Sequence, residues 1–257
     1  MEVLGIDVGG SGIKGAPVDI DTGRLLASRQ RLRTPRPATP EAVAKAVARL
    51  TQRFAWEGPV GCAVPSAVRE GVALSAANVH RSFIGCDVRA LLEKATGRSV
   101  AVLNDADAAG LAEMAFGAGQ GEEGQVLVLT FGTGIGSALF IGGALVPNTE
   151  LGHLEVDGED AERRAAERVR LRQGLSWGEW AARVNRYLEA VETVLYPDLI
   201  VIGGGASNKA DKFTGRLSSR ARLVPATLRN QAGIIGAAVA FGRAPVLVGR
   251  EQYLAPG

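Results

Sequence analysis

The chain has 257 residues, 46% of them hydrophobic, which is enough for one large domain or two small ones with a true core. Its formal net charge of +2 is too small by itself to indicate nucleic-acid binding, and its two cysteines are too few for a disulfide scaffold. No apolar run approaches the ~18 residues of a membrane helix, and the first residues lead straight into a strand pattern, so we expect a cytoplasmic protein without signal peptide, membrane contact or nucleic-acid partner.

The chain opens with a pattern typical of a β-meander. Residues 3–8 form an apolar run that ends near Asp7, and residues 9–12 are a glycine-rich turn. Further strands are predicted over residues 13–20 and 25–33. Because the glycine turn leads back into a strand and not into a helix, the pattern excludes a βαβ phosphate-binding unit.

Helical and strand patterns alternate after the proline-rich residues 34–40. Apolar residues at helical spacing and short buried runs distinguish the two. In chain order we predict a helix over 40–54, a strand over 60–64, a helix over 87–96, a strand over 100–103 and a helix over 106–114.

The meander pattern then occurs a second time, with strands over 126–130, 137–141 and 144–146. Such a duplication predicts an α/β protein of two similar lobes with a cleft between them. We place the lobes at residues 1–104 and 105–257, with the C-terminal end able to return to the first lobe. In the second lobe we predict helix over 160–195, a strand over 199–202 and a small-residue helix over 231–241.

Three glycine turns follow predicted strands, at residues 9–12, 132–136 and 203–205. Glycines let backbone N–H groups approach a phosphate without obstruction by Cβ, and the third turn precedes a predicted helix whose N-terminus favours an anion. Each turn alone is also explained by an ordinary hairpin. Three at strand ends together favour a phosphate-binding role.

Polar residues with possible catalytic or sugar-binding roles stand at a strand end and in two loops. Asp105 follows a strand and could deprotonate a hydroxyl, although a helix N-cap is the alternative for Asn104 and Asp105. Asp107 fits a helix-dipole role better. Donor and acceptor groups also stand at Glu150 and His153, three residues apart, for which a surface pair or a core histidine is the alternative. Asn78 is a further candidate hydroxyl ligand, with an ordinary turn asparagine as its alternative.

The chain resembles the ROK family of sugar kinases and repressors, in the actin-like ATPase superfamily. The matching segments are Asp7-Val8-Gly9-Gly10, Leu103-Asn104-Asp105-Ala106, Gly132-Thr133-Gly134-Ile135-Gly136, Glu150-Leu151-Gly152-His153 and Gly203-Gly204-Gly205.

The resemblance implies an actin-like α/β fold and a role for each matched position. Asp105 corresponds to the catalytic base. The implied sugar ligands are Asn78, Asn104, Asp105, Glu150 and His153. The implied donor-binding residues are Asp7, Gly9, Gly10, Ser11, Gly12, Lys14, Thr133 and Gly134 at the phosphates, and Gly204 and Gly205 at the adenosine end. Lys209 and Lys212 are candidate donor-binding residues because of their charge, and Asp7 at its strand end could hold Mg²⁺ through water.

One departure from the family concerns zinc. Most members carry a cysteine-rich zinc motif soon after the segment that corresponds to residues 150–153, but residues 154–172 contain no cysteine. We therefore expect Mg²⁺ and no zinc. Glu155 is the candidate for the sugar-binding glutamate that follows the motif in other members. Ser66 stands where the resemblance predicts a smaller residue, which affects sugar selectivity.

Within the family, the closer resemblance is to glucokinases that use polyphosphate. It implies phosphoryl transfer from polyphosphate or ATP to the 6-hydroxyl of glucose, in a homodimer. An ATP-dependent kinase of glucose, mannose or an N-acetyl sugar and a sugar sensor without turnover remain alternatives. A basic group after the third glycine turn, which could bind the polyanion, comprises Lys209, Lys212, Arg216, Arg220 and Arg222. Arginines between residues 163 and 172 are interpreted as a solvated helix face.

Overall fold

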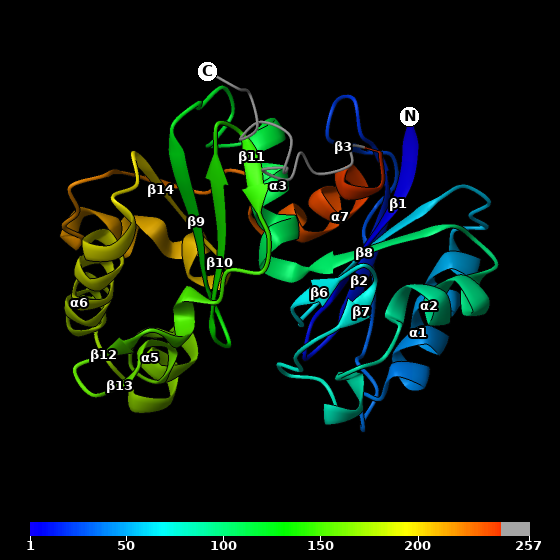
Figure 1. Ribbon diagram of the computed structural model, residues 1–257, viewed down its shortest axis with the longest axis horizontal. Coiled ribbons are helices and arrows are strands. Elements are labelled where there is room, and N and C mark those ends of the chain that lie inside the picture. Colours follow the sequence, from blue (N-terminus) through cyan, green and yellow to red (C-terminus); the bar gives the residue numbers. More distant parts are fainter. Residues whose placement is uncertain (243–257) are drawn as a thin grey trace, which may run out of the picture. The chain divides into compact units, whose positions relative to one another are not determined.

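A computed structural model describes residues 1–242 of the chain, and these residues form two units (Figure 1). The first unit comprises Met1–Ala115 and the described residues from Gln231 onward, and the second unit comprises Phe116–Asn230. The sequence placed the boundary after residue 104, whereas helix α3 (Asp105–Phe116) falls almost entirely within the first unit. Helix α7 (Ala232–Gly242) also belongs to the first unit.

A six-stranded mixed sheet forms the centre of the first unit. Strands β3-β2-β1-β5-β8 lie in that order, and β4 also pairs with β2. β1 runs antiparallel to β2 and parallel to β5, which in turn is parallel to β8. The strands are β1 (Glu2–Val8), β2 (Ile13–Asp19), β3 (Arg24–Leu25), β4 (Gln30–Leu32), β5 (Val60–Val64) and β8 (Val100–Asn104). The predicted strand over 25–33 is two short strands, because the chain bends after Leu25 and rejoins β2 nearer the glycine turn.

Alternate side chains of β1 point into the core of the first unit. Leu4, Ile6 and Val8 are fully buried and pack with the apolar face of α1 (Pro40–Arg53). α2 (Val88–Thr96) begins at the N-cap Asp87 and ends at the left-handed Gly97, as predicted.

Small residues let α7 approach the alternate positions of β1. A Cβ at Gly5 would overlap the carbonyl group of Ile234, so any larger residue there would push the helix away. The carboxylate of Asp7, on the same side of the strand, lies beside Gly233 of α7. The prediction of a closely packed small-residue helix is confirmed.

The second unit repeats the topology of the first. Its five-stranded sheet has the order β11-β10-β9-β14-β15, so a meander is again followed by two parallel strands on the side of its first strand. The strands are β9 (Gln125–Phe131), β10 (Ile135–Ile141), β11 (Ala144–Val146), β14 (Leu199–Gly203) and β15 (Arg222–Pro225). The predicted duplication is therefore confirmed, although β15 had not been predicted.

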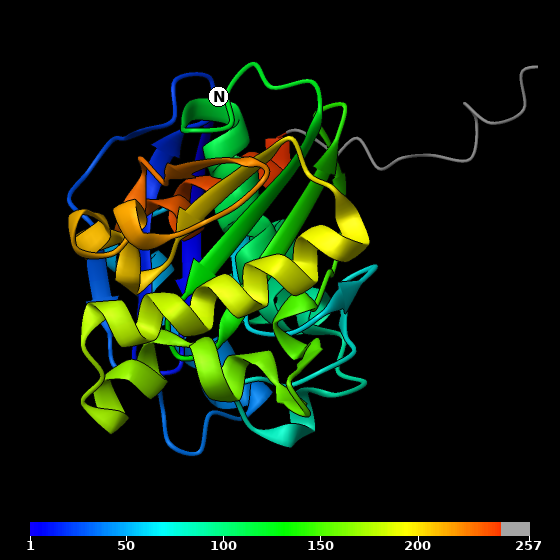
Figure 2. The ribbon, with the colours of Figure 1, turned by 90° about the vertical axis from the view of Figure 1, so that its left-hand side faces the viewer.

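The helical region predicted over residues 160–195 is three helices. Ala166 has extended backbone and separates the first two, and the left-handed Gly174 ends the second. Ser176 then starts the third helix with a capping box to Glu179. The helices are α4 (Ala161–Ala165), α5 (Glu167–Gln173) and α6 (Trp177–Leu195). Figure 2 shows α6, in yellow, lying along one face of its sheet.

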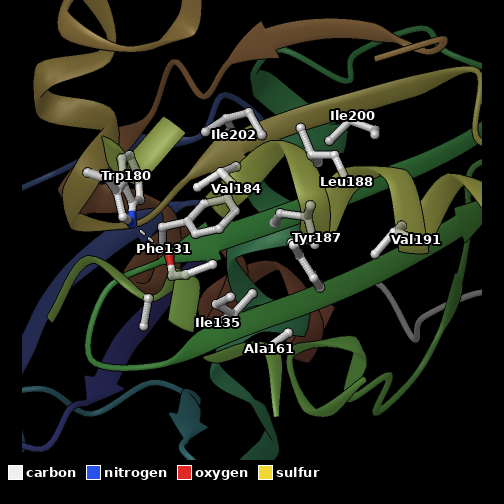
Figure 3. Close-up of a cluster of buried hydrophobic side chains, with 14 of the residues drawn as sticks. Phe131, Ile135, Ala161, Trp180, Val184, Tyr187, Leu188, Val191, Ile200 and Ile202 are labelled. Carbon is white, nitrogen blue, oxygen red and sulfur yellow. Dashed lines mark hydrogen bonds between the residues drawn. The ribbon is translucent and has the colours of Figure 1, made fainter. Parts of the chain in front are cut away.

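Aromatic side chains of α6 hold the end of β9 in the core of the second unit (Figure 3). The ring of Phe131 lies edge-on to Trp180 and Tyr187, with centroids 5.7 Å and 6.2 Å away. The indole Nε1 of Trp180 donates a hydrogen bond of 2.9 Å to the carbonyl of Ala165. Because Phe131 is the last residue of β9, this packing fixes the point where the second glycine turn begins.

Short elements complete the two units. They are β6 (Val68–Arg69), β7 (Val72–Ala73) and η1 (Arg81–Phe83) in the first unit, and η2 (Leu151–His153), β12 (Glu155–Val156), β13 (Glu159–Asp160), η3 (Gly205–Lys212), η4 (Thr214–Arg216) and η5 (Arg229–Gln231), which leads into α7. Among residues 1–242, no helix combines the length and apolar character that crossing a membrane requires.

Candidate active site

Three parallel strands bring candidate residues to one edge of the first sheet. Asp7 of β1 pairs in register with Ala63 of β5, which pairs with Leu103 of β8. The carboxyl ends of parallel strands lie at the same edge, where ligands of α/β proteins bind. The first glycine turn, Ser66 and Asp105 therefore follow strand ends of the same edge.

Asn104 and Asp105 have different environments at the start of α3. The side-chain oxygen of Asn104 accepts hydrogen bonds from the N–H groups of Ala106 and Asp107, at 2.8 Å and 3.1 Å, so Asn104 caps the helix. Its Nδ2 also donates to the carbonyl of Ser66 at 3.2 Å, which leaves one amide hydrogen for a ligand. Asp105 is the first residue of α3 and is partly exposed, whereas Asp107 is only 2% exposed.

The first glycine turn is a closed hairpin turn. Gly9 and Gly12 exchange backbone hydrogen bonds of 3.1 Å and 3.3 Å. Within residues 1–242, no backbone partner is found for the N–H groups of Gly10 and Ser11 at the exposed tip of the turn. These two amides are therefore available to an anion.

The other candidates of the first unit lie close to this turn. The ammonium group of Lys14 lies 3.4 Å from the carboxylate of Asp7, its partner across β1 and β2. Asn78 has a left-handed backbone with φ of 60°, and a Cβ on Gly10 would lie 3.0 Å from the Cβ of Asn78. The structure thus places the predicted sugar ligand Asn78 beside the predicted phosphate turn.

In the second unit, Glu150 is the N-cap residue of the short helix η2, and His153 is the last residue of that helix. The buried hydroxyl of Ser137 donates to the carbonyl of Thr149 at 2.6 Å and accepts from the N–H of Leu151 at 3.0 Å, so it holds both neighbours of Glu150. Partial burial raises the pKa of the Glu150 carboxyl; His153 lowers it, and the nearby Glu162 carboxylate raises it. The hydrogen bond of 2.7 Å between the Nδ1 of His153 and Asp160 is the main cause of a raised His153 pKa.

Glu162 is a site residue that sequence reasoning missed. Its carboxylate accepts a hydrogen bond of 3.4 Å from the N–H of Ile135, at the second glycine turn, and lies within 4.8 Å of ligand atoms of His153 and Asp160. The sequence-based candidate Glu155 is exposed in β12. The hairpin of β12 and β13 separates the two acids, and the carboxylate of Glu162 in α4 is the one bonded at the turn. The spacing of acids along the sequence gives no signal of this contact.

The second and third glycine turns lie together, because β9 and β14 are parallel neighbours in register up to Thr130 and Gly203. Gly204 has φ of 78°, and a Cβ there would lie 2.5 Å from backbone atoms of Phe131, so this position requires glycine. The N–H of Arg168 donates to the carbonyl of Gly132 at 3.0 Å. Thr133 is exposed at the tip of the second turn.

An acidic side chain also lies beside the third turn. The Glu167 carboxylate would lie 2.6 Å from a Cβ on Gly205, and burial raises its pKa. The expected helix after the third turn is instead the 3-10 segment η3, which loses helical geometry at Lys209. The helix-dipole argument for an anion at this turn is therefore weakened, and the backbone N–H groups of the turn remain the main anion-binding feature.

Part of the predicted basic strip has structural partners. Arg222 forms an ion pair with Glu122, and the guanidinium of Arg220 lies 4.4 Å over the ring of Tyr196. Lys209 and Lys212 are exposed, and Lys212 lies 3.7 Å from Asp211. The two lysines are therefore better placed than the two arginines to bind a polyanion.

The residues present do not fit a structural zinc site. His153, Asp160 and Glu162 offer one nitrogen and two carboxylates within 4.8 Å, whereas structural zinc sites use four ligands rich in cysteine. The Nδ1 of His153 is also bonded to Asp160. Asp7 does fit Mg²⁺, because Mg²⁺ prefers one or two carboxylates and retains waters.

Known proteins resemble the chain over most of its length. The ROK family model matches residues 3–170. A polyphosphate glucokinase of Mycobacterium tuberculosis (strain CDC 1551 / Oshkosh) is 53% identical, over 92% of this chain and 90% of that protein. The inorganic polyphosphate/ATP-glucomannokinase of Arthrobacter sp. strain KM is 50% identical, with a TM-score of 0.90 over 94% of this chain and 99% of that one.

A more distant structure supports the fold alone. The ROK family glucokinase of Streptomyces griseus, solved with glucose and AMPPNP, is 24% identical with a TM-score of 0.79, over 93% of this chain and 98% of that one. The two α/β units with repeated topology are those of the actin-like ATPase fold, as predicted. The chain belongs to the ROK family.

Proposed function

We propose that this protein transfers a phosphoryl group from inorganic polyphosphate or ATP to the 6-hydroxyl of glucose. The observation that carries the proposal is the 53% identity to the polyphosphate glucokinase of Mycobacterium tuberculosis, across 90% of that protein. The resemblance of the Arthrobacter glucomannokinase, whose name includes both polyphosphate and ATP, supports the same pair of donors.

In this proposal, Asp105 removes the proton from the attacking hydroxyl. Asn104 caps α3 and so fixes the backbone from which the Asp105 carboxylate extends. Phosphoryl transfer depends on positioning and charge neutralisation more than on covalent chemistry. The open N–H groups of Gly10 and Ser11 supply donors for phosphate oxygens. Asp7 would hold Mg²⁺ through water, and the ion would neutralise phosphate charge.

Residues of the second unit have two proposed roles. Glu150 and His153 bind sugar hydroxyls, since one offers acceptors and the other a donor in the same short segment. The amides of the second and third glycine turns bind donor phosphates. Glu162 joins the sugar-binding set in place of the candidate Glu155, because its carboxylate lies near the ring of His153 and the carboxylate of Asp160.

The test is a matrix of two sugars and two donors. Glucose and mannose are each assayed with ATP and with long-chain polyphosphate, with Mg²⁺ present or removed by chelation, and the sugar 6-phosphate is measured. We expect glucose to be phosphorylated with both donors, and only with Mg²⁺. Activity with ATP alone would reduce the function to that of an ATP-dependent hexose kinase. Glucose binding without phosphorylation would show that the protein is a sugar sensor and not a kinase.

Mannose is the second candidate acceptor. The name of the Arthrobacter relative includes both glucose and mannose as acceptors. A kcat/KM for mannose close to that for glucose in the same matrix would support a glucomannokinase.

We further propose a cytoplasmic homodimer without tightly bound zinc. The free cysteines Cys62 and Cys86 suit a reducing compartment. Elemental measurement on tag-free protein should find less than stoichiometric zinc, and light scattering should give twice the chain mass. One zinc per chain, lost on His153→Ala, would instead establish the site at His153, Asp160 and Glu162.

A further inference from the structure

A basic cavity lies beside the first glycine turn, wholly within the first unit. Its volume is about 570 Å³, in the range of sites for small ligands. The lining residues are Gly10, Ser11, Arg31, Arg33, Thr34 and Arg36. Three of the six are arginines and none is acidic, so the cavity has a strongly positive lining.

The cavity forms because side chains alternate along β4 and because the loop that follows is hydrogen-bonded to the first glycine turn. Leu32 of β4 packs against the core of the first unit, so its neighbours Arg31 and Arg33 extend away from the core. The chain then reaches the buried Thr34, whose hydroxyl donates a hydrogen bond of 2.5 Å to the carbonyl of Gly9. This hydrogen bond holds residues 31–36, which carry the three arginines, next to the first glycine turn.

Arg31 is held directly against the turn. Its Nη2 donates to the carbonyl of Ser11 at 3.0 Å, and a Cβ at Gly12 would overlap its guanidinium. The glycine at position 12 therefore makes room for an arginine and not only for a phosphate. Because Gly12 is itself buried, the guanidinium occupies the space beside it.

The charges of the three arginines are not neutralised within the described part of the chain. Arg31, Arg33 and Arg36 are exposed, and no ion pair to a carboxylate is found for any of them in residues 1–242. By contrast, Arg186 and Arg164 both pair with Asp157, at 2.9 Å and 3.4 Å. Three unpaired guanidinium groups around one cavity repel one another, and a bound polyanion would relieve that repulsion.

We propose that this arginine cavity binds phosphate groups of inorganic polyphosphate that lie beyond the group held by the first glycine turn. The inference rests on the proposed polyphosphate-dependent function. Guanidinium groups remain charged at any physiological pH and form paired hydrogen bonds to phosphate oxygens. A long polyphosphate has further charged groups to place in the cavity, whereas ATP has an uncharged nucleoside after its third phosphate. The cavity therefore favours polyphosphate over ATP.

The test compares the double variant Arg33→Ala/Arg36→Ala with Arg24→Ala/Arg53→Ala. The control removes two exposed arginines of the same unit outside the cavity, so both variants lose the same charge. Arg31 is left intact because it contacts the turn. We expect the cavity variant to raise KM for long-chain polyphosphate about tenfold or more, while KM for ATP and KM for glucose change less than about twofold. The reason is that the lost charge-assisted hydrogen bonds are made to polyphosphate and not to ATP.

Salt dependence provides a second readout. The slope of log KM for polyphosphate against log salt should become shallower by about 0.7 for each lost contact, as for single-stranded polyanions. Equal rises in KM for polyphosphate and ATP, or equal effects of both double variants, would overturn the cavity proposal and leave the proposed function standing.

Direct binding measurements distinguish an error in the cavity proposal from an error in the proposed function. If the wild type uses ATP but not polyphosphate, the proposed donor is wrong. The cavity proposal is then tested by titrating polyphosphate into the protein in the absence of glucose. Polyphosphate binding that is lost in Arg33→Ala/Arg36→Ala and kept in Arg24→Ala/Arg53→Ala would support the cavity as a binding site. Absent binding, or equal competition by single-stranded DNA as a general polyanion, would overturn it.

Discussion

The carboxylate of Glu162 accepts a hydrogen bond from the backbone N–H of Ile135 at 3.4 Å, so an acidic group lies at the second glycine turn. The same carboxylate raises the pKa of His153 and of Glu150. One side chain thus connects the predicted phosphate turn with the predicted sugar-binding segment of the second unit.

Glu162→Gln should lower the pKa of His153, because it removes one of the negative charges that stabilise the protonated ring. Asp160→Asn should lower the pKa of His153 further, since the hydrogen bond that the ring donates to the Asp160 carboxylate is the main cause of the raised value. The chain has only two histidines, so NMR titration with His80→Gln as an assignment control resolves each ring. An unchanged His153 titration in both variants would contradict the observed contacts.

Asp160→Asn should also change how the free energy of unfolding depends on pH. A histidine whose pKa is raised on folding contributes stability below its unfolded pKa of about 6.5, and this contribution is lost as pH rises through the folded pKa. The variant should therefore lose stability at pH 5.5 to 6 and little above pH 8. The loss should stay below about 1 kcal/mol, because the pair is exposed. Urea unfolding across this pH range measures it, and a uniform loss at every pH would point to the capping of α4 instead.

Asp105→Asn should leave glucose affinity nearly intact and reduce kcat by about 10²–10⁴, the usual contribution of a general base. Asparagine retains the acceptor for the N–H of Ala106, so the start of α3 should persist. Steady-state kinetics and calorimetric titration of glucose measure the two quantities. A variant that keeps a tenth of wild-type kcat would remove Asp105 from the role of base.

Ser137→Ala should lower the free energy of unfolding by about 1–3 kcal/mol, because the N–H of Leu151 loses its buried acceptor. It should also raise KM for glucose, since Ser137 holds both neighbours of Glu150. Ser66→Ala is the matched control for the unfolding measurement. The buried Ser66 hydroxyl has no hydrogen-bond partner in the described structure, so its removal should be neutral or stabilising. Equal destabilisation by the two substitutions would show that the Ser66 hydroxyl has a partner.

Lys209→Ala/Lys212→Ala should raise KM for long polyphosphate more than KM for ATP. Both lysines are exposed just after the third glycine turn, where a longer polyanion needs further positive charge. KM for glucose should barely change. Arg220→Ala/Arg222→Ala is the comparison, and it should act through stability, because those arginines stack on Tyr196 and pair with Glu122. An equal rise in KM for polyphosphate and for ATP would instead assign the two lysines to a phosphate site that both donors share.

The sequence by itself determined the repeated meander, the strand ends that carry the glycine turns, and the place of Asp105 where a strand ends and a helix begins. These features depend on residues close together in the chain. Alternating apolar residues require a strand, and glycine or asparagine at a strand end permits a turn or a cap. For the same reason Asp87 and Gly97 predicted the two ends of α2.

Only the tertiary structure decided which distant groups meet. The pairing of β4 with β2 places Arg31 over Gly12, and the hairpin of β12 and β13 separates Glu155 from Glu162, whose carboxylate is the one bonded at the second glycine turn. Contacts elsewhere in the fold give Arg220 and Arg222 partners in Tyr196 and Glu122, whereas Arg33 and Arg36 remain exposed. A charged side chain has no local pattern that marks its partner, because Coulomb attraction and hydrogen bonding depend on distances that the folded backbone sets.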